Sequence, residues 1–222
     1  MFDFLINKSE DGISLTTTGI ISFILLIVLL LLAALSFAKK GKESKFTVKQ
    51  LVFCGIAMAL ALVTSYIQIY SFPFGGSVTL FSMLFICLIG YLYGAKVSIP
   101  VAVAYGILQL IIKPEIYYPL QILVDYPLAF GGLGLAGFFS KSKNGLIKGY
   151  ILGIFGRFIV ASISGYIFFA EYAWKGWHPV PYTLAYNGAY IFTEGALTIA
   201  LLLIPAVTRA VGQVKKMTLE GN

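Results

Sequence analysis

The sequence predicts an all-α membrane protein in which a six-helix bundle follows one extra N-terminal transmembrane helix. Composition is the first observation: 59% of the 222 residues are hydrophobic, 11% are charged, and the mean hydropathy is +0.91. Soluble domains are rarely so apolar. The second observation is a series of apolar runs long enough to cross the hydrocarbon core of a bilayer, about 30 Å. The third is that most cations lie on one side of these runs.

Seven apolar runs are the candidate spans, with approximate bounds 15–38, 48–69, 78–95, 97–112, 117–140, 146–169 and 182–208. The run 97–112 is short for a span and contains Pro100. The basic stretch KKGKESK, residues 39–45, divides the first run from the others. We therefore expect two parts: an anchor helix with a basic linker over residues 1–45, and a six-helix membrane core over residues 46–222.

The first run is predicted to be a retained anchor rather than a cleaved signal peptide. Its apolar stretch is too long, acidic residues precede it at Asp3, Glu10 and Asp11, and the basic cluster follows it. This order of charges places the N-terminus outside the cell.

Positive charge gathers on one side of the seven spans. The opposite side receives only Lys8, Lys113 and Lys175, whereas the first side receives Lys39, Lys40, Lys42, Lys45, Lys49, Lys96, Lys141, Lys143, Lys148, Arg209, Lys215 and Lys216. Because Lys and Arg are enriched in cytoplasmic loops, we expect a multi-pass protein of the cell membrane whose C-terminus is cytoplasmic. The connectors SFPFGGS, KPEIYYP and EYAWKGWHPVPY then face outward. The net charge of +7 reflects this topology, and nucleic acid is not an expected partner.

Four residues are predicted to converge just below the outer surface. Asp125 lies roughly 13 Å inside its helix at 1.5 Å per residue, and Tyr126 follows it. Asn187 lies about a turn and a half inside the last helix, counted from Tyr182. Carboxylates within a membrane are costly and normally face a partner, a cavity or water. We interpret these residues as a binding site, with an aromatic belt at the interface as the alternative for the tyrosines.

The connector AEYAWKGWHPVPYTLAYNG, residues 170–188, is more aromatic than a turn requires. It contains Trp174, Trp177 and the only histidine, His178. We interpret it as part of the wall of the same site, at its mouth. An interface belt is again the alternative for the indoles.

Two opposite charges are predicted at similar depth in the last two helices. Arg157 and Glu194 both lie roughly 16–18 Å from a membrane surface at 1.5 Å per residue. An unpaired charge there is costly, so we expect a mutual, structural ion pair. A role in coupling transport to protons or ions is the alternative.

The chain lacks the motifs of a self-powered pump or an enzyme. It has no G-x-x-x-x-G-K-[ST] loop, no H-E-x-x-H helix and no Cys/His cluster. Cys54 and Cys87 lie in apolar runs, which is typical of small buried side chains. We therefore expect no enzymatic activity, no metal and no cofactor. A partner must then supply the energy for any transport.

Small residues four apart let membrane helices approach closely, and two such tracks lie on the first core helix. One consists of Gly55 and Ala59, the other of Ala57 and Ala61. Both are candidate docking surfaces for a partner, and packing within the bundle is the alternative.

The segments EYAWKGW, PYTLAYNG and QILVDY resemble those of the ThiT-like, thiamine-binding S-components of energy-coupling factor (ECF) vitamin transporters. The similarity covers residues 47 to about 210. It implies a six-helix substrate-binding core and capture of thiamine from the outside. It also implies docking onto a membrane T-component driven by two cytoplasmic ATPase subunits, so that ATP is used only by the partners.

The resemblance also implies particular binding residues. The family's acid and following tyrosine fall on Asp125 and Tyr126, and the pocket tyrosine and asparagine of the last helix fall on Tyr182 and Asn187. The pocket glycine falls on Gly165. The chain departs from the family where Asp125 replaces a glutamate, and where a pocket histidine and two tryptophans are replaced by Ala161, Phe169 and Tyr105, respectively.

Three classes of function remain open at this stage. The first is the vitamin-binding subunit, with thiamine, its phosphates or its pyrimidine precursor as the ligand. The second is a stand-alone secondary transporter for a cationic heterocyclic metabolite, with Arg157 and Glu194 in coupling. The third is an intramembrane enzyme or scaffold, which the missing pairs of nucleophile and base disfavour.

Overall fold

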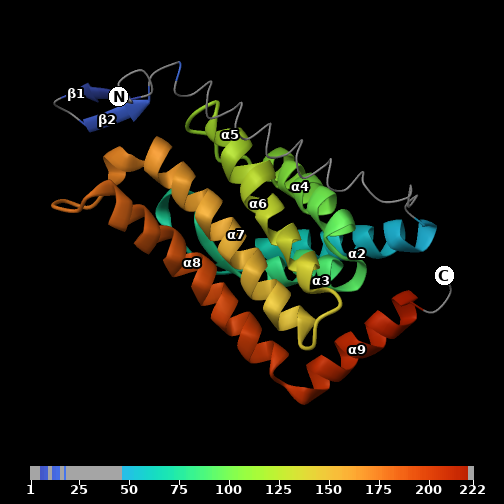
Figure 1. Ribbon diagram of the computed structural model, residues 1–222. Helices are drawn as coiled ribbons and strands as arrows, with labels where there is room; N and C mark the ends of the chain where they lie inside the picture. Colours follow the sequence, from blue (N-terminus) through green and yellow to red (C-terminus); the bar gives the residue numbers. More distant parts are fainter. Residues whose placement is uncertain (1–5, 10–11, 16–17, 19–46, 220–222) are drawn as a thin grey trace. The chain divides into compact units, whose positions relative to one another are not determined.

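The computed structural model describes residues 6–9, 12–15, 18 and 47–219, and the chain divides into two units, Met1–Phe46 and Thr47–Asn222 (Figure 1). In the first unit, strand β1 (Ile6–Ser9) pairs antiparallel with β2 (Gly12–Leu15), with Ile6 opposite Leu15. The sequence did not predict this hairpin. The predicted anchor helix over 15–38 lies almost wholly outside the described residues.

The second unit is a helical core that contains one short hairpin. Its elements are α2 (Val48–Tyr66), β3 (Gln68–Ser71), β4 (Ser77–Thr79), α3 (Ser82–Tyr93), α4 (Ala95–Ile112), α5 (Gln121–Leu123), α6 (Ala129–Gly131), α7 (Gly145–Phe168), α8 (Pro179–Leu202) and α9 (Pro205–Leu219). A π-helical turn, Val124–Leu128, joins α5 to α6, and a 3₁₀ segment, Gly132–Phe139, follows α6.

The predicted helical membrane fold is confirmed. Among the described residues, α2, α4, α7 and the continuous run Gln121–Phe139 are long and apolar enough to cross a membrane, and the bent pair α8–α9 would make a fifth span. Helix α3 has 12 residues, roughly 18 Å at 1.5 Å per residue, which is short of the ~30 Å that a full span needs. That the core crosses the membrane six times therefore stays a prediction.

The last span was predicted to end near residue 208, and this end was wrong. Helix α8 ends at Leu202, and α9 leaves it at 86°. Pro205 begins α9, because proline fits the first turn of a helix but cannot continue one. Near the other end of α9, Lys215 Nζ donates to Ser140 O at 2.6 Å and lies 3.7 Å from the ring centroid of Tyr91. The C-terminal segment is therefore a helix packed on the core.

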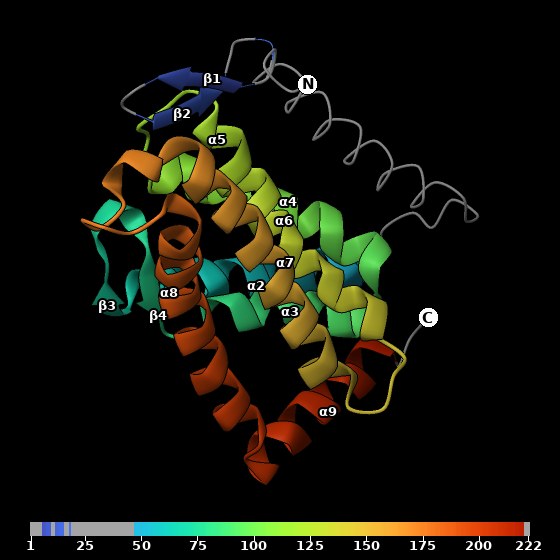
Figure 2. The same ribbon diagram turned by 60° about the vertical axis from the view of Figure 1, so that its left-hand side comes forward.

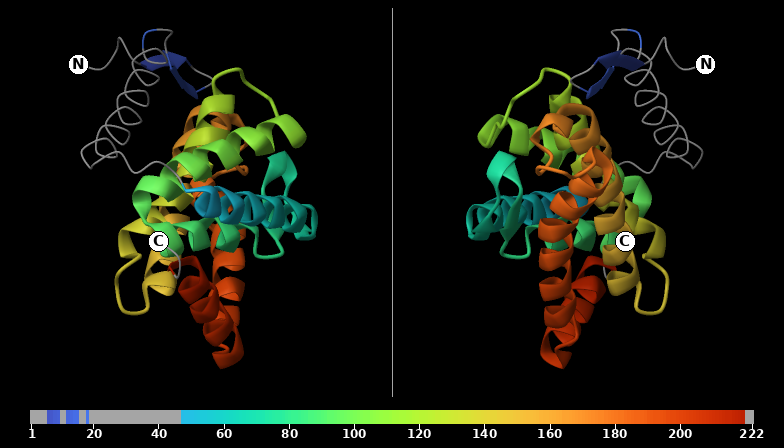
Figure 3. Two further views of the ribbon diagram at one scale, coloured as in Figure 1. Left: turned by 90° about the vertical axis from the view of Figure 1, so that its right-hand side faces the viewer. Right: turned by 90° about the vertical axis from the view of Figure 1, so that its left-hand side faces the viewer.

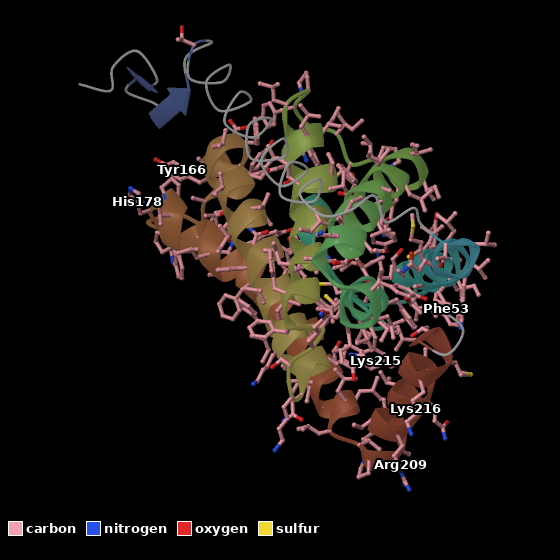
Figure 4. The ribbon with its side chains drawn as sticks, turned by 45° about the vertical axis from the view of Figure 1, so that its right-hand side comes forward. Phe53, Tyr166, His178, Arg209, Lys215 and Lys216 are labelled. Atoms are coloured by element: carbon pink, nitrogen blue, oxygen red, sulfur yellow. The ribbon has the colours of Figure 1, made fainter. Side chains whose placement is uncertain are left out.

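The cations of α9 and the aromatic connector lie at opposite ends of the core. Figure 4 shows Arg209, Lys215 and Lys216 at one end, and Tyr166 and His178 at the other. Separation of this kind accompanies the positive-inside distribution of charge. The orientation of the termini stays a prediction.

Helices α7 and α8 pack side by side, and α4, α5 and α6 lie on the other side of α7 (Figures 1 and 2). Helix α2 crosses this group at a steep angle (Figure 3). Gly106 allows α4 to approach the π-helical turn, because a Cβ there would overlap Tyr126 O. Pro127 explains the wide turn itself, since it lacks an N–H and its ring excludes a regular helical bond.

The two small-residue tracks of α2 face in different directions. Ala57 and Ala61 are 8% and 0% exposed and pack in the core. Gly55 and Ala59 are exposed, and a Cβ at Gly55 would meet nothing within 4 Å. The expectation that Ala57 and Ala61 offer a docking surface is therefore wrong, because their side chains already contact the bundle. Gly55 and Ala59 remain candidates.

Ala61→Trp is expected to lower the stability of the protein, whereas Ala59→Trp is not. A large ring added at a fully buried position displaces its neighbours, which typically costs about 1–3 kcal/mol. Thermal unfolding in detergent, followed by circular dichroism, measures the difference. Equal midpoints for the two variants would contradict the assignment of inner and outer tracks.

Candidate functional site

A cavity of about 150 Å³ lies among α4, the π-helical turn, α7, α8 and the β3–β4 hairpin. A water molecule needs about 10–15 Å³ by a comparable measure, so the cavity has room for roughly ten water molecules or one small organic molecule. All three connectors predicted to face outward contribute to its lining. They supply Gly75 and Gly76, Lys113 and Glu115, and Tyr182, respectively.

Two neighbouring helix faces form much of the lining. Helix α7 contributes residues at every fourth position, and so does α8. These residues are Arg157, Ala161 and Gly165 on α7 with Phe169 directly after its end, and Tyr182, Tyr186, Tyr190 and Glu194 on α8. Residues four apart lie on one helix face, so this spacing was a readable signal in the sequence. Tyr186 and Tyr190, which share this face of α8, were not predicted to line the site.

The π-helical turn places Asp125 and Tyr126 against the cavity. Tyr126 Oη accepts from Glu115 N at 2.6 Å and donates to Lys113 O at 3.1 Å. These bonds hold the start of the α4–α5 connector. The half-buried carboxylate of Asp125 lies beside Gln121 and Ser164. The turn therefore places the carboxylate of Asp125 at the cavity, while Tyr126 holds the α4–α5 connector.

Asn187 is engaged with the protein itself. Its Nδ2 donates to Ala161 O at 3.3 Å, to Thr183 O at 3.0 Å and to Thr183 Oγ1 at 3.2 Å, and its Oδ1 accepts from Tyr190 Oη at 2.8 Å. Gly165 permits this contact between α7 and α8, because a Cβ there would overlap Thr183 Oγ1. Asn187 thus lines the cavity and also fastens its two main walls together.

The aromatic residues singled out in the sequence lie at different distances from the cavity. Tyr182 and Phe169 line it, and Trp174 packs edge-to-face on Tyr182 with 5.4 Å between ring centroids. Trp174 and Trp177 are 52% and 48% exposed and do not line the cavity. Their indoles lie on the outer side of Tyr182.

His178 and Tyr105 also lie outside the lining. His178 is exposed and begins α8, where its Nδ1 accepts from Val180 N at 3.3 Å. Tyr105 is fully buried, and its Oη accepts from Gln109 Nε2. Gln109, which the sequence analysis did not single out, is the residue of this pair that lines the cavity.

A hydrogen bond links two connectors outside the cavity lining. Tyr118 Oη donates to Glu171 Oε1 at 2.6 Å. This bond to a carboxylate raises the pKa of Tyr118 to about 12. The phenol therefore stays protonated and keeps its role as donor throughout the neutral range. It links the α4–α5 connector to the connector between α7 and α8.

Arg157 and Glu194 do not form the predicted ion pair. Glu194 Oε2 accepts from Thr79 N at 2.9 Å and from Thr79 Oγ1 at 2.6 Å. Its Oε1 accepts from Met83 N at 3.1 Å and from Ser82 Oγ at 3.4 Å. The carboxylate thus caps the start of α3, where backbone N–H groups lack helical partners. The sequence predicted Arg157 as the partner of the Glu194 carboxylate. These four donors bind that carboxylate instead.

The comparisons with known proteins agree with this architecture. Residues 51–213 match the model of the family described as "Thiamine transporter protein (Thia_YuaJ)". The chain belongs to this family. The family consists of transporters, so the prediction that the chain is not an enzyme is confirmed.

Individual relatives are similar over different shares of the chain. "Thiamine transporter ThiT" of Bacillus subtilis is 31% identical over 183 residues, which cover 74% of this chain and 94% of the relative. The protein of the same name from Lacticaseibacillus paracasei is 32% identical over 115 residues, 44% of this chain and 57% of the relative. The solved structure of ThiT from Listeria monocytogenes matches with a TM-score of 0.59 at 25% identity, covering 71% of this chain and 96% of that one.

Gly165→Ala is expected to lower both stability and ligand binding, because the added methyl overlaps Thr183 and separates the two walls of the cavity. Gly188→Ala, also on a membrane helix, is the matched control, since its Cβ would find only ordinary contacts of 3.5 Å or more. Thermal unfolding with and without ligand measures both effects. Equal behaviour of the two variants would show that the close approach at Gly165 is not required.

Glu194→Gln is expected to lower stability by about 1–3 kcal/mol, because an amide can no longer accept from every donor at the start of α3. Adding Arg157→Met should not restore the loss, since Arg157 is not the partner of Glu194. Chemical or thermal unfolding of the two single variants and the double variant measures this. Recovery in the double variant would support the ion pair instead.

Proposed function

We propose that the chain is the substrate-binding subunit of an ECF-type vitamin transporter and that it captures thiamine from the outer side of the cell membrane. The observation that carries the proposal is the carboxylate of Asp125 in an aromatic-lined cavity of a thiamine transporter family member. The names of the relatives support the choice of ligand. The cavity supports it on chemical grounds.

Thiamine carries a positive thiazolium, an aminopyrimidine and a hydroxyethyl tail. Aromatic faces attract such a cation by roughly 0.5–2 kcal/mol for each well-placed ring. Asp125 can balance the positive charge or accept from the exocyclic amine. Glu115 adds a second carboxylate near the mouth. A small number of fixed polar groups among aromatic rings is typical of a selective small-molecule site.

The proposed partners are a membrane T-component and two ATPase subunits. The chain has no phosphate-binding loop of its own, so transport against a gradient needs an external source of energy. The exposed track of Gly55 and Ala59 lies on an apolar face of α2 that also exposes Ile56 and Val63. Small residues on such a face allow a second helix to pack closely.

The alternative hypothesis, a stand-alone secondary transporter, loses its main support. It assigned coupling to a pair formed by Arg157 and Glu194, and the carboxylate of Glu194 is instead bound to Thr79, Ser82 and Met83. Uptake of labelled thiamine in cells with and without the ATPase module separates the two mechanisms. Uptake without the module would favour the stand-alone transporter.

Asp125→Asn is expected to weaken thiamine binding by about 1.5–3 kcal/mol, the range for a hydrogen bond to a charged group. Titration calorimetry on the purified chain measures it. Glu171→Gln is the control, because Glu171 is an acid of the same outer side that does not line the cavity. No binding by the unmodified chain at millimolar thiamine would exclude the ligand, and equal affinity of Asp125→Asn would assign Asp125 to structure.

Gly55→Trp and Ala59→Trp are expected to abolish uptake while thiamine binding stays unchanged, because a bulky ring on the outer track prevents close approach of a partner helix. Uptake assays and co-purification with the T-component and ATPases measure the effect. Leu197→Trp, at an exposed apolar position of another helix, α8, is the control. Normal transport by both variants would argue against docking at this track.

A further inference from the structure

Arg157 is a charged residue of the cavity that has no ion-pair partner within 4.0 Å in the described part of the protein. Within residues 47–219 its guanidinium forms no hydrogen bond and no ion pair within 4.0 Å. The guanidinium lies over the face of Phe130, at 4.2 Å from the ring centroid. A guanidinium has five N–H donors, and contact with a ring face satisfies none of them. The side chain is only partly buried, and none of its nitrogens is among the fully buried unpaired polar atoms of the described residues, so water reaches these donors and an acceptor on a ligand can replace that water.

Among residues 47–219, no carboxylate lies within ion-pair distance of the Arg157 guanidinium. Glu194 is bound to the start of α3, and neither Asp125 nor Glu115 lies within ion-pair distance of Arg157, although all of them line the cavity. The other lining residues of α7 and directly after its end are Ala161, Gly165 and Phe169, whose side chains have no hydrogen-bonding group. Arg157 is therefore the donor on this wall of the cavity.

We propose that Arg157 binds the ligand directly, by donating to a hydrogen-bond acceptor on it. The proposal rests on the proposed function and adds a requirement to it. The ligand must present a cationic group to Asp125 and an acceptor to Arg157. Thiamine has both, since its pyrimidine nitrogens and the oxygen of its tail are acceptors. A guanidinium that faced only the thiazolium of the ligand would repel it. Removal of Arg157 would then raise the affinity for thiamine, whereas loss of a hydrogen bond would lower it.

Arg157→Met is expected to weaken thiamine binding roughly 10- to 100-fold, which corresponds to the loss of a hydrogen bond to a charged group. Methionine keeps the apolar stem that packs on Phe130. Arg157→Lys keeps the charge but loses the planar set of donors, and a smaller loss is expected. Arg209→Met is the matched control, because Arg209 is exposed on α9 outside the cavity (Figure 4). Its affinity should be unchanged.

Three ligands locate the acceptor. Calorimetry compares thiamine, thiamine monophosphate, and an N-benzyl thiazolium that keeps the cation and the tail but replaces the pyrimidine with benzene. If Arg157 donates to the pyrimidine, the loss caused by Arg157→Met disappears for the benzyl compound. If it donates to the tail, the loss persists for the benzyl compound and grows for the monophosphate. Either pattern supports the proposal.

Other outcomes overturn it. Affinity that is equal or higher in Arg157→Met would show that the guanidinium makes no favourable contact with the ligand. A loss by the same factor for all three ligands would assign Arg157 to structure. Should Arg157→Met fail to fold, the same comparison is made with Arg157→Lys. If the unmodified chain binds none of the three ligands, the proposed function itself fails, which is a different result from a change confined to the variants.

Discussion

A carboxylate buried in an apolar bundle must find donors, and the start of α3 supplies them to Glu194. Glu194 is 2% exposed and accepts from two backbone N–H groups and two hydroxyls. The arrangement satisfies two needs, since the first turn of α3 has free N–H groups and the carboxylate requires them. The contact also fixes α8 against strand β4 and the start of α3. The wall of the cavity that α8 forms therefore has a defined position.

The same contact determines the electrostatics of the cavity. Glu194 is hydrogen-bonded by Thr79, Ser82 and Met83, so it forms no ion pair with Arg157. The lining then combines the carboxylates of Asp125, Glu115 and Glu194 with a guanidinium that has no ion-pair partner among the described residues. A ligand that carries only a positive charge would satisfy one part of this lining. A ligand with separate cationic and accepting groups would satisfy both.

The sequence predicts depth along a helix better than direction around it. The rise of 1.5 Å per residue placed Asp125, Tyr182 and Asn187 near one end of the bundle, and all three line the cavity. The same rise placed Arg157 and Glu194 at one level, but it contained no information about the short strand beside Glu194. For α2, spacing alone could not distinguish Ala57, which packs inward, from Ala59, which is exposed.

Other features of the fold could not be predicted from patterns in the sequence. The π-helical turn depends on how Pro127 is accommodated between α4 and α7, which is a matter of tertiary packing. Helix α9 was missed because an apolar span that continues into a short basic tail gives no clear sign of a bend. The Tyr186–Tyr190 face of α8, by contrast, could have been found from its four-residue spacing.

The attachment of the β3–β4 hairpin restricts its length. Tyr186 Oη donates to Pro73 O and accepts from Gly76 N, and Glu194, eight residues further along α8, binds Thr79. Eight helical residues rise roughly 12 Å, and the three steps from Gly76 to Thr79 extend roughly 10 Å as a strand. An insertion or deletion of one residue shifts the strand by about 3.3 Å and breaks one attachment. Strand β3 (Gln68–Ser71) is in turn paired with β4, so a change of length there would also shift the register, and the connector is constrained from Gln68 to Thr79.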